Sequence, residues 1–120
     1  MHKTTLVIGA SENPERYSFK AVSLLQNYNV PVYALGNKEG KIGNVEIDTD
    51  KLPYRNIDTV SLYLSPKNQE EYKSYIISLQ PKRVIFNPGT ENPEFYQLLA
   101  LNDIQAEVAC TLVLLATNQY

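Results

Sequence analysis

The chain has 120 residues, 43% of them hydrophobic and 20% charged, with a net charge of −2, which is the composition of an ordinary soluble globular domain. This charge balance argues against non-specific binding to nucleic acid or to anionic membranes, and a single cysteine excludes an intramolecular disulfide. One histidine and one cysteine, at opposite ends, exclude a Cys/His zinc cluster.

No apolar run approaches the ~20 residues of a membrane span, and residues 1–5 lack the features of a signal peptide. We therefore expect one domain over residues 1–120, located in the cytoplasm.

The first third of the chain reads as strand, helix, strand. Thr4–Gly9 is a short apolar run rich in β-branched residues, which is typical of a buried parallel strand. Apolar side chains at helical spacing predict an amphipathic helix over Ser18–Tyr28, and Asn29 suits the left-handed position that follows it. Val30–Leu35 is expected to be the second strand.

The segment from Gly36 to Leu52 is less regular, with three glycines among lysines and asparagines. We expect a loop here, a short strand near Val45–Ile47 and a helical turn around Thr49–Leu52.

The remainder alternates strand and helix again. Strands are expected at Ile57–Leu64, Arg83–Phe86 and Ile104–Ala109. Ser65-Pro66 and Asn92-Pro93 each supply an N-cap and a first-turn proline; the first of these helices must stop before Pro81, and Thr111–Thr117 predicts a short closing helix. This order predicts an α/β fold: a single Rossmann-like domain, a mostly parallel sheet with helices on both faces.

Ligands of such sheets sit beyond the carboxyl ends of the strands. After the first strand, Gly9 permits close backbone approach, and the following helix start favours an anion such as pyrophosphate. Ser11 and Ser18 add hydroxyl donors, and Arg16 adds a guanidinium for phosphate. The pattern G-x-G-x-x-G is absent, so a plain strand-to-helix turn remains the alternative.

The second strand ends in Gly36-Asn37-Lys38, where NAD-binding folds usually carry an acidic residue for the ribose. This disfavours NAD and leaves NADP open, with a solvated loop charge as the alternative role of Lys38. No Ser/His/Asp or Cys/His set and no metal-ligand spacing occur in these loops, so no catalytic or metal residue is predicted. His2 precedes the first strand and is expected at the opposite edge of the sheet.

Four segments together carry a family resemblance. They are VIGAS (Val7 to Ser11), NPERYS (Asn13 to Ser18), Asn37-Lys38 and FNPGTENPE (Phe86 to Glu94), with Cys110 after the last strand. In this order, over almost the whole chain, they resemble the small stand-alone CoA-binding domain proteins, relatives of the nucleotide-binding domain of the succinyl-CoA synthetase alpha subunit. One departure is Leu35-Gly36-Asn37, where many members carry Val-Asn-Pro.

The resemblance implies a coenzyme A pocket. Gly9, Ala10 and Ser11 would hold the pyrophosphate, Arg16 would meet phosphates, and Lys38 would meet the 3′-phosphate of the ribose. The other residues implied to contact the cofactor are Asn13, Pro14, Tyr17, Ser18, Asn37, Ser65, Pro66, Asn87, Pro88, Gly89 and Cys110. Of these, Ser65-Pro66 would lie on the adenine side and residues 87–89 along the pantetheine.

Three alternatives to a non-catalytic CoA or acyl-CoA binding module remain open. The first is a subunit of a CoA-using transferase or ligase completed by a partner chain, since the catalytic histidine of the larger synthetase belongs to a second domain. The second is an NADP-binding protein. The third is a redox sensor using Cys110, although a buried small side chain is the commoner state of a free cysteine. A homo-oligomer is compatible with all of them.

Overall fold

The computed structural model describes residues 3–120. The strands of its sheet are β1 (Thr5–Ala10), β2 (Val32–Gly36), β3 (Gly40–Ile42), β4 (Val45–Asp48), β5 (Thr59–Leu62), β6 (Arg83–Phe86) and β7 (Gln105–Val108). The helices are α1 (Tyr17–Asn27), α2 (Pro66–Gln69), α3 (Lys73–Leu79), α4 (Pro93–Leu101) and α5 (Thr111–Ala116), with one turn of 3₁₀-helix (Glu70–Tyr72) between α2 and α3.

The sheet has the order β3-β4-β2-β1-β5-β6-β7. All neighbouring strands are parallel except β3 and β4, which form an antiparallel hairpin at one edge. The chain therefore builds outward from β1 to β2 and β4, then crosses to the other side of β1 and continues through β5, β6 and β7. The prediction of an α/β, Rossmann-like domain with a mostly parallel sheet is confirmed.

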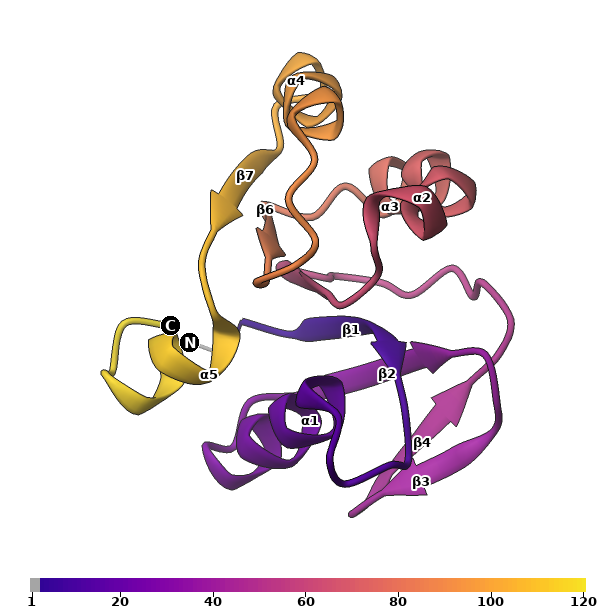
Figure 1. The fold of residues 1–120 in the computed structure, drawn as a ribbon, viewed down its shortest axis with the longest axis vertical. Coiled ribbons are helices and arrows are strands. Elements are labelled where there is room, and N and C mark those ends of the chain that lie inside the picture. Colours follow the sequence, from indigo (N-terminus) through magenta and orange to yellow (C-terminus); the bar gives the residue numbers. More distant parts are fainter. Residues whose placement is uncertain (1–2) are drawn as a thin grey trace.

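Helices cover both faces of the sheet, as Figure 1 shows. On one face α1 and α5 lie together, and Val22, Leu25 and Leu115 from these helices pack against Val7 and Ala34. The other face is covered by α2, α3 and α4. Burial on both faces explains why β1 and β6 are rich in apolar residues rather than alternating, and why even the polar residues of β5, Thr59 and Ser61, are fully buried.

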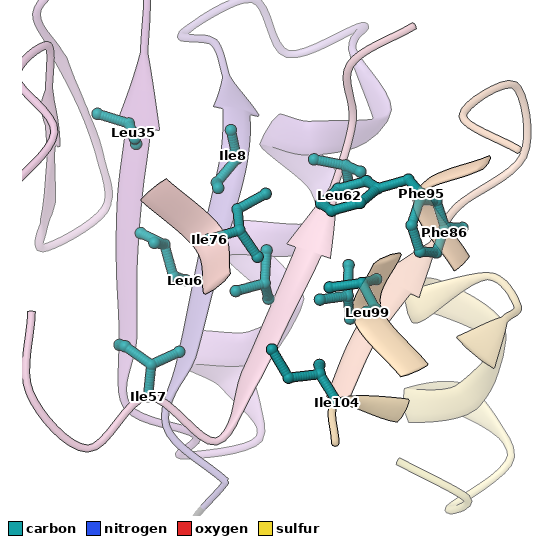
Figure 2. Packing of buried hydrophobic residues seen from close by; sticks show 12 residues of the cluster. Leu6, Ile8, Leu35, Ile57, Leu62, Ile76, Phe86, Phe95, Leu99 and Ile104 are labelled. Carbon is teal, nitrogen blue, oxygen red and sulfur yellow. The ribbon is translucent and has the colours of Figure 1, made fainter. Parts of the chain in front are cut away.

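The larger core cluster lies under α3 and α4 (Figure 2). Ile76, Phe95 and Leu99 are fully buried against strand residues such as Phe86. The rings of Phe86 and Phe95 meet edge to face, with centroids 5.7 Å apart. Each such side chain contributes about 1.5–3 kcal/mol through burial, so the helices are fixed to the sheet mainly by these contacts.

One local expectation is wrong, and one strand was not predicted. The helical turn expected at Thr49–Leu52 is irregular chain with a bend at Asp50. Pro53 disfavours helical backbone at Leu52, and the Tyr75 hydroxyl donates to the Leu52 carbonyl at 2.5 Å. The strand expected near Val45–Ile47 is present as β4, but the sequence did not predict its partner β3.

The helix expected between Ser65 and Pro81 is interrupted by the 3₁₀ turn. The interruption follows Gln69, a fully buried side chain whose amide donates to the carbonyls of Leu64 (2.9 Å) and Thr90 (2.7 Å). Ser65 occupies the N-cap position, yet within residues 3–120 its hydroxyl makes no capping bond. Its carbonyl accepts the N–H groups of Asn68 and Gln69 instead.

Candidate functional site

The topology directs attention to the carboxyl ends of β1, β2 and β5. β1 lies between β2 and β5, and the connections that leave β1 and β5 lead to helices on opposite faces of the sheet, α1 and α2. A crevice therefore opens at this point, where the strand order reverses. A pocket of about 440 Å³ lies there. It is lined by Gly9, Ala10, Ser11, Glu12, Asn13, Arg16, Asn37, Lys38, Glu39, Tyr63 and Leu64.

Gly9 shapes the floor of this pocket. It has φ of +94°, and a Cβ atom at this position would lie 2.8 Å from the Tyr63 carbonyl oxygen. The register of β1 against β2 shifts between Ile8 and Ala10. Glycine is therefore required both by the backbone conformation and by the close approach of β5.

The loop after β1 is organised by its own side chains. The Ser11 hydroxyl accepts the Asn13 N–H at 3.1 Å, and the Asn13 carboxamide oxygen accepts the Glu15 N–H at 3.0 Å. The Asn13 carbonyl accepts the Arg16 N–H at 3.0 Å. Arg16 takes the N-cap position of α1 with extended backbone, so the pocket faces the helix end at which free N–H groups and the positive end of the dipole favour an anion.

The loop after β2 forms the opposite wall. Gly36 packs directly on β1, since a Cβ there would lie 2.3 Å from the Ala10 carbonyl oxygen. Asn37, Lys38 and Glu39 follow and are exposed. Arg16 and Lys38 thus place two cations on the two loops that border the pocket, and each can donate charge-assisted hydrogen bonds to a phosphate.

Two carboxylates also line the pocket, those of Glu12 and Glu39. The sequence did not predict Glu12, Glu39, Tyr63 or Leu64 as residues of the site. Tyr63 and Leu64 directly follow β5, and the switch-point rule applied to that strand would have found them. Glu39 carried no such signal, because its position depends on the unpredicted hairpin.

A second hollow of about 410 Å³ lies beside the hairpin and shares Glu39. Its other charged lining residues are Glu46, Asp48 and Asp50. Four carboxylates around one hollow repel a phosphate group, so the pocket that contains Arg16 and Lys38 is the better site for an anionic ligand.

The structure brings together seven of the predicted residues, namely Gly9, Ala10, Ser11, Asn13, Arg16, Asn37 and Lys38. The remaining ones lie outside the lining of this pocket: Pro14, Tyr17, Ser18, Ser65, Pro66, Asn87, Pro88, Gly89 and Cys110. Among them Ser18 is buried in α1, Tyr17 is 67% exposed, and Pro88 and Gly89 are exposed. The expectation for His2 falls outside the described residues.

Asn87 is fully buried and holds three elements together. Its amide donates to the Ser61 hydroxyl at 3.0 Å and the Leu62 carbonyl at 2.9 Å, and its oxygen accepts the Thr111 N–H at 2.8 Å. Asn87 therefore joins β5, β6 and the start of α5. Cys110, half-buried, stands next to this junction.

Tyr63 contributes an unusual buried group. Its hydroxyl is inaccessible and has no hydrogen-bond partner within residues 3–120. The hydroxyls of Ser61 and Thr111 bond each other at 2.7 Å. Burial raises the pKa of Tyr63 to about 12. The phenol therefore remains neutral at physiological pH.

A model of the CoA binding domain family matches residues 3–116. The chain belongs to this family. The family assignment and the pocket at the strand switch point together indicate a module that binds a small molecule.

Solved structures agree on the fold. The crystal structure of an uncharacterized protein is 38% identical, with a TM-score of 0.97, and the match covers 100% of this chain and 99% of that one. A Thermus thermophilus protein is 19% identical, with a TM-score of 0.87 over 99% of this chain and 91% of that one. Aspartate dehydrogenase from Thermotoga maritima is 20% identical, with a TM-score of 0.58 over 92% of this chain and 46% of that one. The last two show the shared fold alone.

Comparison with the curated proteins finds no match. Within residues 3–120, every helix is too short or too polar to cross a membrane. The same residues contain no group of three or more His, Cys, Asp or Glu side chains that could hold a metal ion.

Proposed function

We propose that this chain binds coenzyme A, or an acyl-CoA, in the pocket at the ends of β1, β2 and β5. The observation that carries the proposal is the pair of cations, Arg16 and Lys38, on the two loops that border this pocket in a member of the CoA binding domain family. A ligand with several phosphates suits two separated cations and a helix start better than a neutral ligand does.

Each part of the pocket has a role in this proposal. Gly9, Ala10, Ser11 and the start of α1 hold the pyrophosphate, assisted by Arg16. Lys38 binds the 3′-phosphate, and the neighbouring Glu39 carboxylate accepts a hydrogen bond from a ribose hydroxyl. The pantetheine then leaves toward the ends of β5 and β6.

In this proposal the protein is a binding module of the cytoplasm, where a free thiol such as Cys110 stays reduced. A chemical step would require groups from another chain. Tyr63, neutral and buried at the pocket wall, supplies packing for the ligand rather than acid or base catalysis.

A thermal-shift panel with CoA, acetyl-CoA, dephospho-CoA, NAD and NADP tests the proposal. A ligand at about a hundred times its dissociation constant stabilises the folded state by roughly 2.7 kcal/mol, which is several degrees for a domain of this size. We expect a shift with CoA and a smaller one with dephospho-CoA. A shift with NADP alone would overturn CoA as the ligand, and no shift with any compound would mean that this chain by itself has no nucleotide site.

A further inference from the structure

Glu12 connects the loop after β1 to the hairpin formed by β3 and β4. Its carboxylate accepts the backbone N–H of Lys41 at 2.8 Å. On the way it crosses Gly40 so closely that a Cβ atom there would lie 2.3 Å from the Glu12 Cδ and 2.4 Å from its Cγ. In Figure 1 the same loop descends from β1 to the side of β3.

The hairpin is fixed at a second point, on α1. The Gln26 carboxamide donates to the Ile42 carbonyl at 2.8 Å and accepts the Asn44 N–H at 3.0 Å. With Gln26 holding the turn and Glu12 holding the start of β3, the hairpin cannot move freely relative to the loop after β1.

The residues between β2 and β3 are Asn37, Lys38 and Glu39, and they form one wall of the pocket. This wall is anchored at one end by β2. At its other end it is anchored by the bond from Glu12 to Lys41. Glu12 therefore links the wall that carries Lys38 to the loop after β1, which carries Arg16.

We propose that Glu12 is a positioning residue, which holds the wall containing Lys38 at a fixed distance from Arg16 by binding the Lys41 N–H across Gly40. This inference rests on the proposed function, because it assigns Lys38 the phosphate group that dephospho-CoA lacks. The same bond commits the Glu12 carboxylate to a backbone donor, which reduces the repulsion that a free carboxylate in the pocket would exert on a phosphate.

Four variants test this role. Glu12→Ala removes the bond, and Glu12→Gln removes the charge but keeps an oxygen acceptor. Glu15→Ala is the matched control, since it removes an equal charge from an exposed residue of the same loop. Gly40→Ala disrupts the same bond without changing Glu12 itself, because the added methyl group displaces the flexible end of the Glu12 side chain.

The first readout is the ratio of the affinities for CoA and dephospho-CoA, measured by titration calorimetry. We expect Glu12→Ala and Gly40→Ala to lower this ratio roughly three- to tenfold, the range of one hydrogen bond, and Glu12→Gln to restore most of it. Glu15→Ala should leave the ratio unchanged. Equal ratios for Glu12→Ala and Glu15→Ala would overturn the proposal.

The second readout, hydrogen exchange of the Lys41 amide, needs no ligand. Exchange should accelerate in Glu12→Ala and Gly40→Ala but not in Glu15→Ala; an unchanged rate would show that the bond does not persist in solution and would also overturn the proposal. If the wild type binds neither compound, the proposed function fails, and with it the ligand role of Glu12, while slowed exchange in the wild type would still establish the bond.

Discussion

Gly9 meets two separate requirements, a positive φ and the nearness of the Tyr63 carbonyl. Gly89 has nearly the same φ, +92°, but open space around its Cβ position. Both Gly9→Ala and Gly89→Ala should cost about 1–3 kcal/mol of unfolding free energy for the strained backbone, and Gly9→Ala should cost more because β1 and β5 must separate. Urea unfolding of the two variants measures this difference, and equal losses would contradict it.

Arg16 and Lys38 are the residues on which CoA binding should depend most. Replacing either with alanine should weaken CoA binding by about 1.5–3 kcal/mol, the range of hydrogen bonds to charged groups, and leave folding nearly intact because both side chains are exposed. Titration calorimetry provides the test. Lys20→Ala, which removes the same charge from an exposed residue of α1, is the control, and wild-type affinity in both variants would exclude these two residues from the site.

Some site residues could be predicted from the sequence, and others could not. Gly9, Ser11, Arg16 and Lys38 could be selected because they lie at or just beyond the ends of predicted strands, and the structure places them in one pocket. Asn87 also follows a predicted strand, but its carboxamide makes its hydrogen bonds within the protein. A strand-end position shows that a side chain is near the crevice, but only the packed structure shows which way it points.

The hairpin is the element whose identity the sequence concealed most. β3 has three residues and one polar side chain among them, too short a segment for its alternation to be distinguished from a loop. The turn at Gly43 and Asn44 follows β3 directly, and Gly43 has φ of +61°. The hairpin is recognised by its contacts to α1 and to the loop after β1, which are distant in sequence.

Gln26 should therefore control the order of the hairpin. Replacing it with alanine removes one donor and one acceptor and should cost about 1–2 kcal/mol of unfolding free energy, together with faster amide exchange at Ile42 and Asn44. Asn27→Ala, an exposed neighbour on α1, is the control. The same exchange rates in both variants would show that the hairpin is held without Gln26.

For the whole molecule, the alternation of buried strands and amphipathic helices was sufficient to predict the fold class, because each parallel strand requires a helix to return the chain. Six of the strands, all except β3, and the helices α1 and α5 were predicted close to their observed bounds, and the start of α4 was predicted at Asn92-Pro93. What remained unpredictable depends on tertiary contacts: the Gln69 bonds that accompany the break between α2 and α3, and the tyrosine hydroxyls that hold residues 48–54 in place.

Three tyrosines, Tyr54, Tyr63 and Tyr75, limit the stability of the folded domain at high pH. Burial raises the pKa values of Tyr63 and Tyr75 to about 12 from an ordinary value of 10.0, and burial also raises that of Tyr54. The folded state thus favours the neutral phenols, so this stability is fully present below pH 10 and is lost as the pH rises toward 12. Urea unfolding as a function of pH, with tyrosinate absorbance as a second probe, should show this loss.

Tyr63→Phe separates the contribution of one ring. Phenylalanine keeps the packing and cannot ionise, so the decline of stability between pH 10 and pH 12 should be shallower in this variant. An unchanged slope would mean that Tyr63 ionises in the folded protein without cost.

Lys3 and Tyr120 meet at the amino ends of the strands, where the Lys3 ammonium donates to the Tyr120 backbone oxygen at 2.7 Å and Arg83 donates to the same oxygen at 2.8 Å. The pocket lies at the carboxyl ends of the strands, which is the opposite end of the sheet. A surface, label or fused domain attached beyond either residue is thus held away from the crevice, and a molecule tethered in this way presents the loops around its pocket to the surrounding solution.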